Sequence, residues 1–212
     1  MNESRDTLTP NLYVVAAPSG GGKTSLISAL IRQDSRVRLS VSYTTRPPRP
    51  GEQDGVHYHF VDESEFLDLV SRNAFLEHAR VFDHRYGTGR QAVEQQLASG
   101  HDVILDIDWQ GARQIRETFP SCRSIFIIPP SLDVLRQRLT ARGQDSETVI
   151  KRRMRDAQAE ISHWNEFDFL IINDNFDEAL SDLQAIVRTG KSNRPVTGRQ
   201  RREILAELLG TG

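Results

Sequence analysis

The stretch from Leu12 to Leu30, LYVVAAPSGGGKTSLISAL, constrains the fold more than any other part of the chain. A short apolar run ends in three glycines, and Lys23-Thr24 then opens a pattern typical of a helix. This order is that of the strand, loop and helix around a phosphate-binding loop. Glycines tolerate positive φ, so backbone N–H groups can converge on an anion, and the helix start adds unpaired N–H groups. The expected nucleotide-binding residues are Ala17, Pro18, Ser19, Gly20, Gly21, Gly22, Lys23 and Thr24.

Two of these residues have expected chemical roles, and one departs from the usual pattern. Lys23 would reach the outer phosphates of a nucleoside triphosphate, and the Thr24 hydroxyl would ligate Mg²⁺. Ala17 stands where the pattern GxxxxGK[ST] has its first glycine. Because alanine carries a Cβ, we expect this position to have ordinary strand or turn dihedrals. The alternative for the stretch is a glycine-rich turn with an incidental lysine.

Size and composition predict one domain, or one core with inserted subdomains. The chain has 212 residues, 26% of them charged, and a net charge of −2, which gives no reason to expect a nucleic-acid or membrane surface. Cys122 is the one cysteine, so neither a disulfide nor a cysteine zinc site is expected. The six histidines show no paired ligand spacing. The polar start MNESRDT and the lack of a long apolar stretch predict a soluble, cytoplasmic protein.

Beyond the loop, apolar runs alternate with helical patterns, which predicts a wound parallel sheet. The expected strands of this sheet are residues 12–17, 102–108, 124–128 and 169–173. The expected helices are residues 23–32, 62–73, 90–99, 112–118, 132–141, 147–167, 176–189 and 200–209. An insert predicts a small antiparallel subdomain, with strands at 39–43, 56–61 and 74–81 and a turn at 85–89.

Charged residues gather at three further places. Arg46 and Arg49 lie three residues apart on a proline-stiffened segment and could clamp one phosphate, although a solvated linker is the alternative. Asp106 and Asp108 end a buried strand, where period 2 places them on the same side. Several arginines line the helical hairpin near 131–155, and we expect about half of them to form a solvated face.

At this point the chain resembles the guanylate kinase family, the ATP:GMP phosphotransferases, from about Leu12 to Thr189. The resemblance rests on an ordered set of motifs: APSGGGKT, SVSYTTRPPRPGE, HYHFV, FLEHARV, YGT, LDIDWQG, RSIFIIPPS, RLTARGQDSE and LIINDNF. It implies a three-layer α/β fold with a phosphate loop and a parallel central sheet, formed by about 11–39, 96–130 and 156–190. It also implies a small antiparallel GMP-binding region near 40–95, an arginine-bearing helical lid near 131–155, and a C-terminal tail and helix at 191–212.

The resemblance also implies roles for individual residues. The GMP phosphate would be held by Arg46, Arg49, Tyr58 and Tyr86, and the guanine would be addressed by Ser42, Glu77, Thr88 and Asp108. The catalytic cations would be Lys23, Arg138, Arg142 and Arg153. Mg²⁺ would be held by Thr24 and, through water, by Asp106, and Asn173 would contact the adenine of ATP. The expected partners are ATP and GMP, with dGMP as a second acceptor.

The chemistry of guanine supports Glu77 independently of the family. Guanine presents N1–H and N2–H₂ as adjacent donors, and an ionised carboxylate only accepts hydrogen bonds. Adenine has no hydrogen at N1 and would leave that carboxylate unmatched. A site built in this way can reject the wrong base by a large factor.

Two other functions remain as alternatives at this stage. Guanylate-kinase-like domains exist that bind phosphoproteins without catalysis, but these generally have degenerate phosphate loops. A phosphate-loop kinase acting on another small phosphate is the other alternative. The amphipathic segment 200–209 could dock on its own chain or pair with a second copy to form a homo-oligomer.

Overall fold

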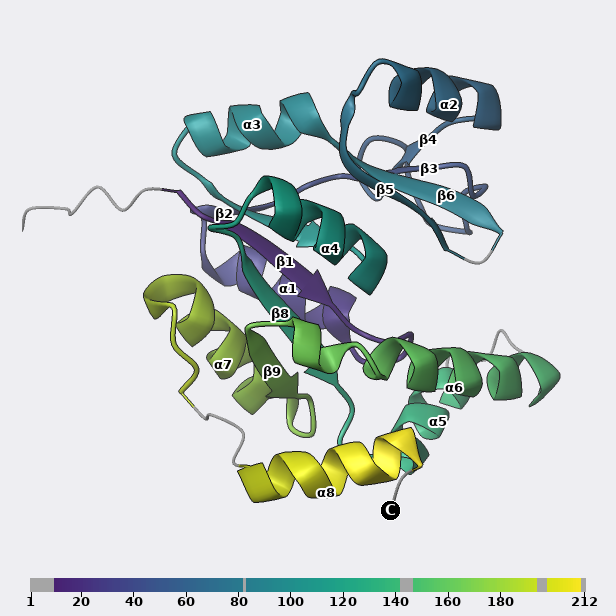
Figure 1. Cartoon of the computed structure of the whole chain (residues 1–212), viewed down its shortest axis with the longest axis vertical. Coiled ribbons are helices and arrows are strands. Elements are labelled where there is room, and N and C mark those ends of the chain that lie inside the picture. The colour runs from purple at the N-terminus through teal and green to yellow at the C-terminus, as the bar shows by residue number, and fades with distance from the viewer. Residues whose placement is uncertain (1–9, 82, 142–146, 194–197, 211–212) are drawn as a thin grey trace, which may run out of the picture.

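A computed structural model describes residues 10–81, 83–141, 147–193 and 198–210 of the chain. Its centre is a sheet of five parallel strands in the order β2-β7-β1-β8-β9 (Figure 1). The strands are β1 (Leu12–Ala16), β2 (Val37–Leu39), β7 (Asp102–Asp106), β8 (Arg123–Ile128) and β9 (Phe169–Ile172). The parallel sheet predicted from the alternating pattern is confirmed, and its carboxyl edge carries the loops that follow β1 and β7.

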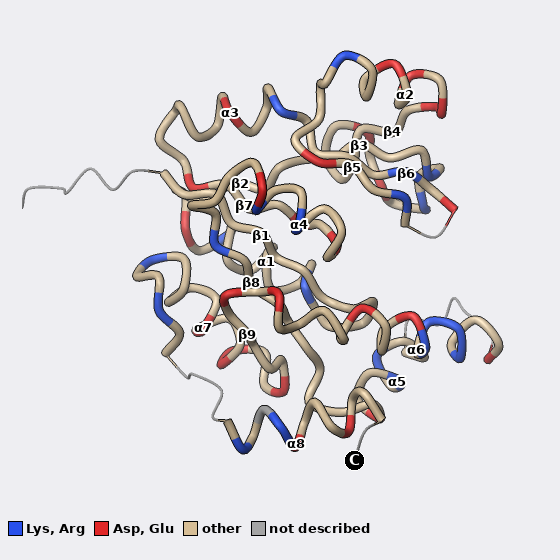
Figure 2. The backbone as a smooth tube through the Cα atoms, viewed as in Figure 1, with Lys and Arg blue, Asp and Glu red and all other residues tan. Residues whose placement is uncertain are grey.

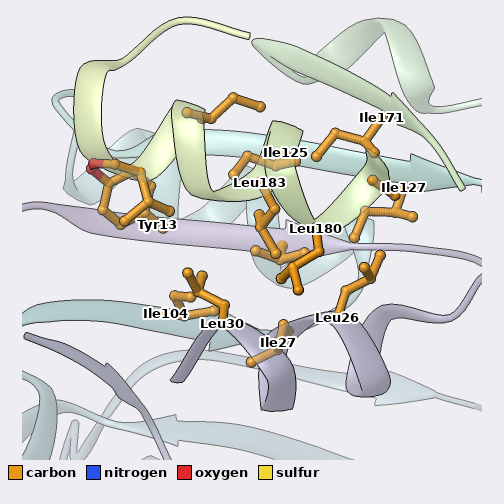
Figure 3. Close-up of a cluster of buried hydrophobic side chains, with 14 of the residues drawn as sticks. Tyr13, Leu26, Ile27, Leu30, Ile104, Ile125, Ile127, Ile171, Leu180 and Leu183 are labelled. Carbon is orange, nitrogen blue, oxygen red and sulfur yellow. The ribbon is translucent and has the colours of Figure 1, made fainter. Parts of the chain in front are cut away.

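Helices cover both faces of this sheet, which gives three layers. On one face, α1 (Lys23–Gln33) and α7 (Phe176–Thr189) pack against Tyr13 and Val15 of β1, as Figure 3 shows for part of this cluster. On the other face, α3 (Arg90–Ala98) and α4 (Trp109–Thr118) cover Leu12 and Val14. Alternate residues of β1 therefore enter opposite layers, as expected for a strand buried on both sides.

A second, smaller sheet stands beside the carboxyl edge of the first, in the order β4-β3-β6-β5 (Figure 1). Its strands are β3 (Tyr43–Thr44), β4 (His59–Phe60), β5 (Phe75–Val81) and β6 (His84–Gly89). β3 and β5 both pair antiparallel with β6, which confirms the antiparallel subdomain, and β4 joins β3 in parallel. Helix α2 (Glu63–Ser71) covers this sheet through Phe66, whose ring centroid lies 4.8 Å from that of Phe75.

The remaining helices form a helical hairpin and a single helix that packs across its base. α5 (Leu132–Ala141) and α6 (Glu147–Ile161) make the hairpin. α8 (Gly198–Leu209) lies across its base (Figure 1), where the Leu132 N–H donates to Glu207 Oε1 and Gln158 Nε2 donates to the Leu208 carbonyl. Leu205 and Leu208 are buried in the same chain's third apolar cluster. The apolar face of α8 is thus covered by the same chain, which is one of the two alternatives given for this segment.

Glycine misled the sequence interpretation at residues 85–89, which form strand β6 and not a turn. A Cβ on Gly87 would lie 3.1 Å from atoms of both Phe66 and Phe75. The glycine therefore allows aromatic rings to pack on the strand, and it does not mark a reversal of the chain.

Other predicted boundaries were also wrong. The single strand expected at 39–43 divides, because Leu39 ends β2 in the large sheet and Tyr43 begins β3 in the small one. The strand expected at 56–61 is only the two residues of β4. The helix expected at 147–167 ends at Ile161 and is followed by a 3₁₀ turn, Trp164–Glu166, because Trp164 and Phe167 turn back onto the apolar core.

Candidate functional site

The phosphate loop lies between β1 and α1, at the carboxyl edge of the large sheet. Gly20 and Gly22 both have a φ of 90°, a left-handed conformation that glycine adopts without a steric penalty. Gly22 is the N-cap of α1 and has no side chain to bond the first helical N–H groups, which leaves them for a ligand. Ala17 is not among the residues with positive φ, so the expectation of ordinary dihedrals at this position is confirmed.

A cavity runs beneath this loop, and we call it the loop pocket. It is lined by Ala17, Pro18, Ser19, Gly20, Gly22, Lys23, Thr24, Ser25, Tyr58, Val81, Asp106, Asp108 and Glu160. At its floor the Lys23 ammonium lies 2.5 Å from Asp106 Oδ1 and donates to the Ile107 carbonyl at 3.1 Å. The loop lysine is therefore fixed by the end of β7, and the Thr24 hydroxyl and the Asp106 carboxylate border the same space.

A second cavity, which we call the sheet pocket, adjoins the first. It is lined by Lys23, Ser42, Tyr58, Glu77, Ala79, Val81, Tyr86, Asp106, Ile107 and Asp108. Five side chains predicted for the acceptor thus gather here, although they come from separate segments: Ser42, Tyr58, Glu77, Tyr86 and Asp108. The two pockets share five lining residues, so ligands in the two would meet there: Lys23, Tyr58, Val81, Asp106 and Asp108.

Glu77 is the most buried acid of the sheet pocket, with 3% of its surface exposed. The Thr88 hydroxyl, itself fully buried, donates to Glu77 Oε1 at 2.6 Å, which places Thr88 behind the carboxylate. Burial raises the pKa of Glu77 to about 7, and the negative charge of Asp108 adds to the effect, while the bond from Thr88 opposes it. A ligand that donates hydrogen bonds to this carboxylate would favour its ionised form.

Asp108 combines a structural role with its position in the pocket. It is the N-cap of α4, where Oδ1 accepts from the Gly111 N–H at 2.9 Å and Oδ2 accepts from Gln110 Nε2 at 3.0 Å. The strand expected at 102–108 ends at Asp106, so strand alternation is not what aligns the two aspartates. The cap turns Asp108 back towards the pocket.

Arg46 and Arg49 stand differently around the sheet pocket. Arg46 is 9% exposed, bonds Glu52 Oε1 at 2.9 Å and lies 5.4 Å from the centroid of the Tyr58 ring. It therefore borders the pocket from behind Tyr58. Arg49 is exposed on the segment that follows, where its backbone N–H donates to Glu52 Oε2. Neither arginine is a lining residue of the sheet pocket.

The hairpin brings one predicted arginine to the phosphate loop. Arg138 Nη2 donates to the Asn173 carbonyl at 2.8 Å, while its buried Nη1 has no partner within the part of the chain that the structure describes. Asn173 in turn donates from Nδ2 to the Gly21 carbonyl at 2.8 Å. Arg153 is half-buried on α6, and Arg142 lies outside the described residues. Figure 2 shows Lys and Arg residues on α6 and, separately, on the small sheet.

Sequence interpretation missed Glu160, an acid of α6 that lines the loop pocket. The Ser19 backbone N–H, inside the phosphate loop, favours the ionised form of its carboxylate. Burial raises the pKa of Glu160 to about 7, against the lowering effect of the Lys23 charge. No local motif marked this residue, because it lies on an amphipathic helix where acids are common.

The described residues offer neither a cluster of metal ligands nor a membrane-spanning helix. No group of three or more His, Cys, Asp and Glu side chains there could hold a metal ion. None of the helices in the described ranges is long and apolar enough to cross a membrane. Cys122 is buried in the second apolar cluster.

Comparisons with known proteins agree on one family. Residues 9–190 match the family described as Guanylate kinase. The chain is 59% identical over 202 residues to "Guanylate kinase" of Alkalilimnicola ehrlichii, covering 94% of this chain and 98% of that protein. It is 55% identical to "Guanylate kinase" of Nitrosococcus oceani, covering 95% and 100%. A crystal structure of guanylate kinase from Anaplasma phagocytophilum superposes with a TM-score of 0.72 at 34% identity, covering 93% and 94%.

Proposed function

Since the chain belongs to the guanylate kinase family and phosphorylates GMP with ATP, we propose that the loop pocket holds ATP and the sheet pocket holds GMP. The observation that carries this division is the buried carboxylate of Glu77 in one of two cavities that meet at Lys23. The three parts expected from the sequence correspond, on this proposal, to the large sheet, the small sheet and the α5–α6 hairpin.

In the loop pocket, backbone and cations would act together on the ATP phosphates. The open N–H groups at the start of α1 would bind an anion, and Lys23 would exchange its contact with Asp106 for the outer phosphates. Arg138 has a buried guanidinium nitrogen in need of an acceptor, which supports its placement beside the transferring phosphoryl group. Arg142 and Arg153 are proposed for the same group, and Asn173 for the adenine.

In the sheet pocket, the guanine would lie against Glu77, with its N1–H and N2–H₂ donating to the carboxylate. Ser42, Thr88 and Asp108 complete this end of the pocket. The phosphate of GMP would face Tyr58 and Tyr86, with Arg46 behind them and Arg49 on the adjacent exposed segment. We propose dGMP as a second acceptor, since the residues assigned here act on the base and the phosphate.

The oxygen atoms around Lys23 also suit Mg²⁺, which the reaction would require. Mg²⁺ prefers oxygen ligands and usually combines one or two protein groups with substrate phosphates. The Thr24 hydroxyl and the Asp106 carboxylate border the loop pocket and fit this pattern. When bound, the ion would neutralise charge on the phosphates of ATP.

The chain's own groups would then act mainly by positioning and electrostatics. The two pockets bring donor and acceptor phosphates together at Lys23, and the cations stabilise charge spread over the equatorial oxygens during in-line transfer. The acceptor is already an anionic phosphate, so no general base is assigned. Closure of the α5–α6 hairpin would exclude water and prevent hydrolysis of ATP. We place this reaction in the cytoplasm, which the buried thiol of Cys122 and a single-cysteine composition support.

Glu77→Gln tests the division of the pockets. The amide presents a donor where the carboxylate accepts, so we expect KM for GMP to rise about 100-fold while KM for ATP stays within twofold. A coupled assay of ADP release with GMP, dGMP and AMP as acceptors measures this. Glu65→Gln, an exposed acid on α2, is the matched control. Equal losses for GMP and AMP would contradict the proposed role of Glu77.

The two alternatives to this enzyme lose support from the same residues. A phosphoprotein-binding module without catalysis would not need Gly22, Lys23 and Thr24 in a loop with two left-handed glycines and a fixed lysine. A kinase for another small phosphate would not need a buried acid in the acceptor pocket. Neither is favoured by any observation in the described structure.

A further inference from the structure

A glycine outside the predicted site lies directly against the base-reading acid. Gly111 is the third residue of α4, and a methyl group built on its Cα would lie 2.9 Å from Glu77 Cδ and closer still to Glu77 Oε2. Non-bonded heavy atoms pack best at about 3.5–4.0 Å, so no side chain fits at position 111 while Glu77 stays in place. Gly111 does not have positive φ, so backbone conformation is not the reason for glycine here.

The neighbouring contacts prevent helix α4 from moving away. Gln114, one turn further along α4, donates from Nε2 to the His78 carbonyl at 2.9 Å and accepts from the His78 N–H at 3.1 Å. His78 is adjacent to Glu77 in β5, so this pair of bonds fixes the distance between the strand and the helix. Thr88 holds the Glu77 carboxylate from the other side.

Gly111 also determines where the second acid of the pocket lies. Its N–H donates to Asp108 Oδ1, so the same residue contacts Glu77 through its Cα and Asp108 through its nitrogen. The carboxylates of Glu77 and Asp108 both line the sheet pocket. Their positions relative to each other therefore depend on close approach of the helix at this one residue.

We propose that Gly111 is a specificity-determining positioning residue: the absence of a side chain there lets the Glu77 carboxylate lie against the start of α4, where it can read guanine. This inference rests on the proposed role of Glu77. A methyl group at 111 displaces the carboxylate within the pocket, so the cost appears in recognition of the acceptor base. The ATP side of the site lies beyond Lys23 and is unaffected.

Gly111→Ala tests this inference, with Gly198→Ala as the matched control. Gly198 also lies in the first turn of a helix without positive φ, and a methyl group there would approach only Arg202 Nη1, at 3.7 Å. We expect Gly111→Ala to raise KM for GMP at least tenfold and to reduce discrimination against AMP, with KM for ATP within twofold. Gly198→Ala should match the unmodified enzyme in all three quantities.

A double-mutant cycle with Glu77→Ala separates the inference from the proposed function. Once the carboxylate is gone, Gly111→Ala should change KM for GMP by less than twofold, because nothing remains to be displaced. If Gly111→Ala alone fails to fold, recovery of folding in the Glu77→Ala background carries the same inference. A normal KM for GMP in Gly111→Ala, or an undiminished effect in that background, overturns it. If Glu77→Ala itself leaves KM for GMP unchanged, the proposed role of Glu77 fails first.

Discussion

Most lining residues of the loop pocket come from one segment, residues 17–25, whereas those of the sheet pocket come from several distant segments. Phosphate is alike in every nucleotide, so a fixed ring of N–H groups suffices for it. A site that selects one base must place hydrogen-bond acceptors opposite the donors of that base. The first pocket can therefore be built locally, and the second depends on how two sheets and α4 pack together.

The largest effect should come from the lysine that lines both pockets. Lys23→Ala removes the cation at their junction, and we expect kcat to fall about 10²–10³-fold, as for loss of one transition-state donor. GMP affinity should stay within threefold, because the sheet pocket keeps its reading groups. Turnover from ADP release and GMP binding by calorimetry measure the two effects. Lys191→Ala, an exposed lysine, is the control. Unchanged turnover in Lys23→Ala would refute the proposed mechanism.

A second effect should appear in the stability of the ligand-free protein. The pKa of Glu77 is raised to about 7, so the folded state holds a proton there that the unfolded state releases near pH 4.5. Stability therefore falls as pH rises through this window. Between pH 5 and pH 8, the free energy of unfolding should fall by about 2 kcal/mol more in the unmodified protein than in Glu77→Gln. Urea denaturation at both pH values measures it, and parallel curves would show that the carboxylate is not buried in solution.

A third, smaller effect is the pH dependence of ligand affinity, which should have opposite signs in the two pockets. Each holds a carboxyl group with a pKa of about 7, Glu77 in one and Glu160 in the other. Guanine needs Glu77 ionised, so GMP affinity should fall about tenfold per pH unit below 7. ATP brings negative charge towards Glu160, so protonation there should strengthen ATP binding as pH falls.

Matched variants isolate these two titrations from those of the ligands. Glu77→Gln should remove the pH dependence from GMP binding, and Glu160→Gln should remove it from ATP binding, each leaving the other intact. Calorimetric affinities between pH 5.5 and 8.5 provide the data. If the affinities for GMP and ATP changed in the same direction with pH, the proposed difference between the two pockets would be wrong.

The smallest effect should come from Ala17, which stands where the phosphate-loop pattern has its first glycine. Ala17 has no positive φ, so Ala17→Gly relieves no backbone strain. It adds chain freedom to the unfolded state and should cost about 0.4–1 kcal/mol of stability. Turnover should change less than twofold. Thermal unfolding and the ADP-release assay measure both, and a large gain in turnover would show that the alanine limits the loop.

The same contrast explains what could be predicted from the sequence. The phosphate loop, the parallel sheet and α7, Phe176–Thr189, follow from patterns within short windows. Ser42 and Glu77 carry no local signal of their own and required resemblance to a family. Glu160 and Gly111 escaped both approaches, because an acid on a helix and a glycine near a cap are ordinary until the fold brings them to a pocket wall. Strand β6 was missed for a related reason, since Gly87 leaves room for the aromatic rings that pack on it.

The ion pair between Lys23 and Asp106 has a consequence for which anions the loop pocket selects. Asp106 is the counter-ion of the lysine, so the lysine does not present an unbalanced positive charge to the solution. A small inorganic anion that enters must displace a carboxylate that the protein already holds at the right distance. A nucleotide brings several phosphates and a base to the same exchange. The ion pair would therefore favour a nucleotide over free inorganic phosphate.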